Sequence, residues 1–259
     1  MSSDVLDPDA EHARIYPTGY RLVPWGAGTA FAALALAFVV YVLGDSVLAS
    51  VAIFLGLYTR DPVIFSIVAY QFLALGVALS VYWLIVHRTG AGPKALGFRF
   101  PGISSLVRAL LTLVPIFVGV DLISVAFSAF FPGFHLQGNA KQELPVGTHV
   151  NLLRALLVLV WASVEAPLAE EVLFRGIIFQ GITRFTSHKL GLTMSVFVGA
   201  LTSGAIFGIV HGELHTLPIL MFLGIALAYV FYYSHSIYAS ILVHGAVNVI
   251  AAISVIHGA

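Results

Sequence analysis

The decisive stretch of this sequence reads Leu168-Ala169-Glu170-Glu171-Val172-Leu173-Phe174-Arg175-Gly176, with three charged side chains among apolar ones. A charge at the centre of a membrane helix costs about 2.5–3.5 kcal/mol, so three unpaired charges would cost on the order of 8 kcal/mol. Such residues are rare, face a polar interior and usually carry function. The stretch therefore predicts a membrane helix with a functional polar site. A purely structural ion pair near the interface is the alternative.

The composition outside this stretch is that of a membrane protein. Of the 259 residues, 59% are hydrophobic and only 9% are charged, whereas soluble domains carry about 25% charged residues. The net charge of zero gives no indication of a nucleic-acid partner. The absence of cysteine excludes disulfides, thiolate nucleophiles and thiolate metal ligands.

Apolar segments long enough to span a bilayer follow one another along the chain, since a spanning helix needs about 20 apolar residues. They cover approximately residues 25–58, 62–87, 105–131, 150 to beyond the carboxylates, 192–211, 214–233 and 237–256. We expect an all-α, polytopic transmembrane bundle of seven spans, with the active site inside the membrane. The count becomes eight if residues 25–58, interrupted at Gly44-Asp45, form two spans rather than one. Pro167 is expected to kink the helix that carries the carboxylates.

Three regions are predicted from this pattern: a polar N-terminal tail (1–24), N-terminal transmembrane helices with their connectors (25–149), and a core that carries the candidate site (150–259). Lys and Arg concentrate in residues 88–108 and 175–189, which places both connectors in the cytoplasm by the positive-inside rule. The polar segment 132–149 is then expected on the outside.

Spacing assigns different roles to the two carboxylates. Glu171 and Arg175 are four residues apart and share a helix face, so they can form an ion pair. Glu170 points about 100° away and remains available for chemistry. Further polar residues in apolar segments are His211, His244 and Asn248.

Glycine or alanine flanks both imidazoles, which favours close helix packing and a common site. A carboxylate or imidazole there can activate water as a general base, and the Asn248 amide can donate to an oxyanion. Glu170, His211 and His244 also match the three ligands of a catalytic Zn²⁺. His215 is a second candidate partner for His211, although Pro218 predicts that it lies in a loop.

Three motifs in chain order resemble one family. They are Glu170-Glu171-Val172-Leu173-Phe174-Arg175, Phe207-Gly208-Ile209-Val210-His211 and His244-Gly245-Ala246-Val247-Asn248. These resemble the Glu-Glu-x-x-x-Arg, Phe-x-x-x-His and His-x-x-x-Asn signatures of the CAAX proteases and bacteriocin-processing enzymes, which are type II CAAX prenyl protease-like intramembrane proteases. The resemblance covers roughly residues 150–256.

The resemblance implies an intramembrane endopeptidase of glutamate or metal-dependent type. Glu170 and His211 would activate water, His244 and Asn248 would stabilise the oxyanion, and Glu171, Arg175 and Phe207 would support the site. It implies a multi-pass protein of the bacterial plasma membrane that acts on a peptide or lipidated protein, with Zn²⁺ left open and no organic cofactor expected. The alternatives are a catalytically silent binding or immunity protein of the same fold and a proton-coupled transporter.

Overall fold

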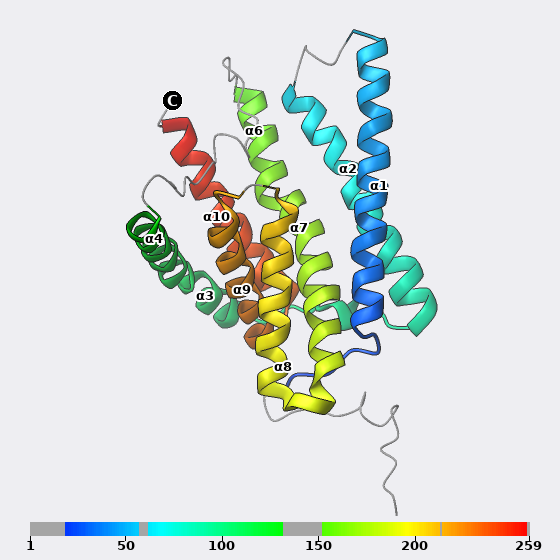
Figure 1. The fold of residues 1–259 in the computed structure, drawn as a ribbon, viewed down its shortest axis with the longest axis vertical. Coiled ribbons are helices and arrows are strands. Elements are labelled where there is room, and N and C mark those ends of the chain that lie inside the picture. The colour runs from blue at the N-terminus through cyan, green and yellow to red at the C-terminus, as the bar shows by residue number, and fades with distance from the viewer. Residues whose placement is uncertain (1–18, 57–61, 132–151, 213, 258–259) are drawn as a thin grey trace, which may run out of the picture.

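The computed structural model describes residues 19–56, 62–131, 152–212 and 214–257, and these contain helices and no β-strand (Figure 1). The regular α-helices are α1 (Ala27–Phe54), α2 (Pro62–Ser80), α3 (Ile103–Leu111), α4 (Leu113–Phe130), α6 (Leu152–Val160), α7 (Ala166–Glu171), α8 (Gln180–Val210), α9 (Leu217–Ser234) and α10 (Ile237–His257). Three π-helical segments, η2 (Val81–His87), η4 (Trp161–Glu165) and η5 (Val172–Phe179), and one 3₁₀ turn, η3 (Pro93–Leu96), complete the described elements.

The expected helical membrane bundle is confirmed. Five described helical stretches are long and apolar enough to cross a membrane, and the apolar helix Ile237–Ile253 is somewhat shorter. One of the five, Ala155–Val210, contains 56 residues and turns back at Gly191, whose φ of 70° and ψ of 167° are not helical. Its two legs run in opposite directions in Figure 1. The described part of the first apolar segment forms one helix, α1, and the expected loop 132–149 lies outside the described residues.

Small residues bring the helices into close contact. Ala30, Ala33 and Ala37 of α1 are completely buried. A Cβ atom added to Gly76 of α2 would lie 2.7 Å from the Cα of Ala37, so only glycine fits between these backbones. Because lipid supplies little hydrophobic force between helices, such close packing is a main source of their association.

The last residues of the predicted 1–24 tail belong to the packed structure. Tyr20, Leu22 and Val23 are buried, and the carbonyl of Val23 accepts a 2.7 Å hydrogen bond from Nη1 of Arg184. The adjacent Trp25 indole donates to the Ile177 carbonyl at 3.1 Å. These contacts hold the start of α1 against η5 and α8, which follow the carboxylates in the chain. Residues 1–18 of the expected tail lie outside the described residues.

The basic connectors gather at one end of the bundle. The loop after η2, the turn of α8 and the turn between α9 and α10 lie together at the lower end in Figure 1. Hydrogen bonds join them: Gln180 donates to the Ala95 carbonyl at 2.9 Å, and the Ile237 amide donates to the Gly97 carbonyl at 2.8 Å. The cytoplasmic placement of this end stays a prediction.

Candidate active site

The two carboxylates lie on α7, a helix of six residues between the π-helical segments η4 and η5. The sequence predicts a kink at Pro167, and the structure has the widened turn η4 directly before this part of the chain. Proline has no N–H to donate to the preceding turn, so the regular hydrogen-bond ladder is interrupted there. π-helical turns often occur at functional sites, and here they flank Glu170 and Glu171 on both sides.

The expected pair of Glu171 and Arg175 is present and completely buried. Nη1 of Arg175 lies 2.7 Å from Oε1 of Glu171, and both side chains are 0% exposed. Nη2 of the guanidinium donates to the Gly224 carbonyl of α9 at 3.2 Å. The guanidinium carbon also lies 4.8 Å from the centre of the Phe207 ring, within the range of a cation–π interaction. This pair therefore connects three helices.

His244 lies between the two carboxylates. Its Nδ1 is 2.9 Å from Oε1 of Glu171, and its Nε2 is 3.7 Å from Oε2 of Glu170. Helix α10 can place the imidazole there because Gly245 packs directly under the carbonyl of Ser163 in η4. The sequence predicted that His244 approaches Glu170, but it assigned Glu171 to Arg175 alone.

Glu170 has a partner that the sequence analysis missed. The hydroxyl of Tyr70 in α2 donates to Oε1 of Glu170 at 2.8 Å and lies 3.2 Å from the Ala166 carbonyl. The next residue, Gln71, donates through Nε2 to Oε1 of Glu165. The consecutive polar pair Tyr70-Gln71 within an apolar span was the available signal, because polar groups in a spanning helix need partners.

Glu170 and His211 line the same cavity, which has a volume of ≈ 180 Å³. Tyr41 and Tyr70 contribute to its wall, together with the apolar residues Leu34, Ala37, Phe38, Leu73, Leu173, Phe174 and Val210. The cavity thus lies between α1 and α2 on one side and the carboxylate helix with the end of α8 on the other.

The orientation of His211 leaves one ring nitrogen available for chemistry. Its Nδ1 lies 2.6 Å from the carbonyl of Phe207. Because a carbonyl oxygen only accepts hydrogen bonds, Nδ1 carries the proton, and Nε2 of the neutral ring holds a lone pair. The Phe207 ring contacts both imidazoles, with centroid distances of 4.6 Å to His211 and 5.7 Å to His244.

Asn248 lies one turn after His244 on α10. Its Nδ2 donates to the Ala162 carbonyl in η4 at 2.7 Å. The amide thus lies beside the widened turn that leads to the carboxylates. Neither Asn248 nor His244 belongs to the residues that line the cavity of Glu170 and His211.

The described residues do not form a ligand cluster for the expected Zn²⁺. Among the described residues, no group of three or more His, Cys, Asp or Glu side chains is placed to hold a metal ion. Glu170, His211 and His244 do not form such a set, and His215 lies in the turn before α9. A role for Zn²⁺ therefore stays a prediction that metal analysis can test.

The fold and the site define a multi-pass helical membrane protein with a buried carboxylate–histidine cluster. Residues 152–250 match the family described as type II CAAX prenyl endopeptidase Rce1-like, and all seven predicted site residues lie in this range. The chain thus contains an Rce1-like domain, which at the level of the family is a protease. No curated protein and no solved structure gives a significant match to the chain.

Proposed function

We propose that this protein is an intramembrane endopeptidase in which Glu170 and His211 activate water for peptide hydrolysis. The observation that carries the proposal is that both side chains line one cavity of ≈ 180 Å³. A general base must reach the proton that it removes, directly or through one water. A cavity between a carboxylate and an imidazole provides a position for that water.

The hydrogen bonds of the two residues support this assignment. Nδ1 of His211 is held by the Phe207 carbonyl, so Nε2 can accept a proton from water. Oε1 of Glu170 is held by Tyr70, while Oε2 is the oxygen nearer to His244. The reaction then adds water to the scissile carbonyl carbon, passes the proton to the leaving amine and breaks the C–N bond, without an acyl-enzyme.

We assign oxyanion stabilisation to His244 and Asn248. With Glu171 ionised, Nδ1 of His244 donates to that carboxylate, so Nε2 can donate to an oxyanion only when the ring is protonated. Asn248 donates one amide hydrogen to the Ala162 carbonyl and has a second one available for an oxyanion.

Glu171, Arg175 and Phe207 support the site in this proposal. Glu171 accepts hydrogen bonds from both Arg175 and His244, so it fixes the position of the imidazole. Phe207 packs against both imidazoles and under the guanidinium. The substrate that suits a cavity between membrane helices is a membrane-delivered peptide or lipidated protein, and we place the enzyme in the bacterial plasma membrane.

The sequence leaves two other functions open. A silent binding protein would have no need for a carboxylate and an imidazole on one cavity. Secondary transporters are commonly built from two repeats whose interface holds the coupling-ion site, so polar groups come from both halves of the chain. Here the buried ionic cluster of Glu171, Arg175 and His244 lies wholly in the second half. Both observations favour the protease.

The test is cleavage of membrane-delivered peptides in proteoliposomes by the wild type and Glu170→Gln. Asp121→Asn on the exposed surface of α4 is the matched control, because it makes the same chemical change at a residue that does not line the cavity. The proposal expects cleavage by the wild type and the control only. Proton uptake without cleavage would support the transporter, and peptide binding without cleavage would support the silent binder. Metal analysis of the same preparations tests Zn²⁺.

A further inference from the structure

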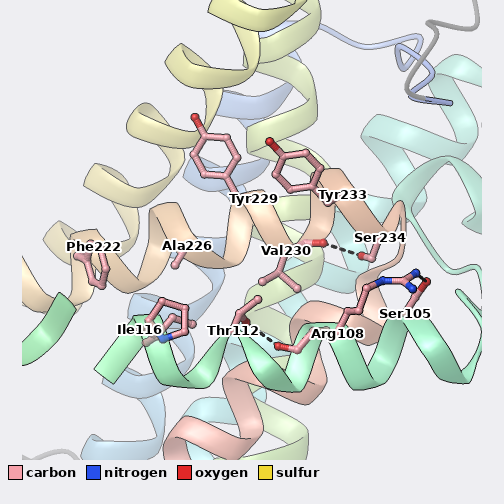
Figure 2. Close-up of a pocket in the computed structure, with 12 residues that line it drawn as sticks. Ser105, Arg108, Thr112, Ile116, Phe222, Ala226, Tyr229, Val230, Tyr233 and Ser234 are labelled. Carbon is pink, nitrogen blue, oxygen red and sulfur yellow. Dashed lines mark hydrogen bonds between the residues drawn. The ribbon is translucent and has the colours of Figure 1, made fainter. Parts of the chain in front are cut away.

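A second hollow lies against α9 and is larger than the cavity of Glu170 and His211. It has a volume of ≈ 380 Å³ and runs between α9 and the pair α3 and α4 (Figure 2). Its lining includes Arg108 and Thr112 on one side and Ala226 and Val230 on the other. None of the seven predicted site residues lines it, so it is separate from the catalytic cavity.

The lining changes from polar to apolar along the groove. Arg108, Ser105 and Ser234 lie at one end, and Ile116 and Phe222 lie at the other end in Figure 2. The polar end coincides with the end of α9 at Ser234, where the basic connectors of the bundle gather. Such a lining fits a molecule with a charged head and an apolar chain.

Arg108 supplies the charge at the polar end. Its side chain is exposed, and Nη2 donates to Oγ of Ser105 at 2.8 Å. No carboxylate pairs with it within the part of the chain that the structure describes. A guanidinium can form two parallel hydrogen bonds with a phosphate. Arg108 is therefore able to bind an anionic headgroup at the mouth of the groove.

The tyrosines at the rim indicate the depth of this end in the membrane. Tyr229 and Tyr233 stack with centroids 6.2 Å apart, and their hydroxyls point in the same general direction in Figure 2. Tyrosine is enriched where the hydrocarbon region meets the headgroups. Arg108 thus lies where a lipid phosphate is found, and the apolar part of the groove extends from it along the spanning helices.

We propose that the groove between α3, α4 and α9 binds one anionic glycerophospholipid. The phosphate lies on Arg108 and an acyl chain lies along Ala226 toward Ile116 and Phe222. Basic pockets between membrane helices on the cytoplasmic side bind anionic headgroups in this manner. Each methylene buried in the groove adds contact with apolar side chains, whereas a soluble anion would leave that part of the groove unused.

The test is lipid retention measured by native mass spectrometry. The full-length protein is reconstituted in vesicles of phosphatidylcholine and phosphatidylglycerol at equal amounts and then extracted. We expect the wild type to retain phosphatidylglycerol in preference to phosphatidylcholine. Arg108→Gln should reduce this preference about tenfold, the effect of losing one charge-assisted hydrogen bond. Ala226→Trp should reduce retention of both lipids, because it fills the groove.

The matched control is Arg88→Gln, which removes the same charge from an exposed residue that does not line the groove. It should retain the wild-type preference. An equal loss in Arg88→Gln and Arg108→Gln would show unspecific attraction of surrounding lipid and would overturn the proposal. An unchanged preference in Arg108→Gln, in protein that elutes and melts like the wild type, would also overturn it.

Discussion

The phenol of Tyr70 donates a 2.8 Å hydrogen bond to Glu170, although 100 residues separate the two in the sequence. The hydrogen bond occupies Oε1 and leaves Oε2 as the oxygen nearer to His244. Tyr70 therefore positions the carboxylate that we assign to water activation.

Tyr70→Phe tests this positioning role. A hydrogen bond to a charged group contributes about 1.5–3 kcal/mol, so we expect kcat for peptide cleavage to fall by roughly 10-fold or more. KM should change little, because the cavity keeps its shape. Tyr82→Phe, at an exposed tyrosine in η2, is the control and should cleave like the wild type. A purely structural role for Tyr70 would instead lower the melting temperature and leave kcat of the folded protein unchanged.

Glu170→Gln should abolish turnover and preserve the fold. Glutamine retains the shape and an acceptor for the Tyr70 hydroxyl but cannot remove a proton from water. Loss of a general base lowers rates by about 10²–10⁴-fold. Single-turnover cleavage, with peptide binding measured in parallel, separates chemistry from binding. Cleavage at the wild-type rate would refute the assignment of Glu170 as the base.

Arg175→Ala should destabilise the protein severely. The substitution leaves Glu171 buried at 0% exposure with an uncompensated charge, and breaking a buried pair costs about 3–5 kcal/mol. Melting in detergent should show the loss, together with a reduced yield of folded protein. Arg175→Lys keeps a positive charge but cannot reproduce the contacts to both Glu171 and Gly224. Its melting temperature should therefore lie between those of the wild type and Arg175→Ala. A normal melting temperature for Arg175→Ala would contradict a structural role for the pair.

Gly245→Ala should lower the melting temperature of the protein although it adds only one methyl group. The new Cβ would collide with the Ser163 carbonyl, so α10 has to move away from η4 and take His244 with it. Overpacking of this kind costs about 1–3 kcal/mol. Gly28→Ala is the control, because this helical glycine in α1 faces open space and alanine favours helix by about 1 kcal/mol. Equal melting temperatures for the two variants would refute the packing argument.

Local patterns in the sequence predicted the parts of the structure that depend on neighbouring residues. The apolar segments predicted the spanning helices, and the four-residue spacing predicted the pair of Glu171 and Arg175. The contact between Tyr70 and Glu170 depends on how α2 packs against α7, and no spacing within a helix reveals it. The double role of Glu171, which holds both Arg175 and His244, likewise arises only when α10 approaches.

The π-helical segments were missed for a related reason. The composition of Val172–Phe179 fits an ordinary α-helix, although the structure forms a buried π-helical segment there. Pro167 marked the irregularity near η4 but did not specify its form. Neither a proline nor an apolar run in the sequence therefore specifies a π-helical turn by itself.

The wall of the cavity of Glu170 and His211 extends beyond the segment that similarity detects. Ala37 and Tyr41 of α1 and Tyr70 of α2 line it, yet the family match begins at residue 152. A recombinant fragment that starts at residue 150 would leave Glu170 without its phenol and open the cavity to the surroundings. If the proposed function holds, different first and second helices around the same motif residues change which peptides fit, so the smallest active unit includes both helices.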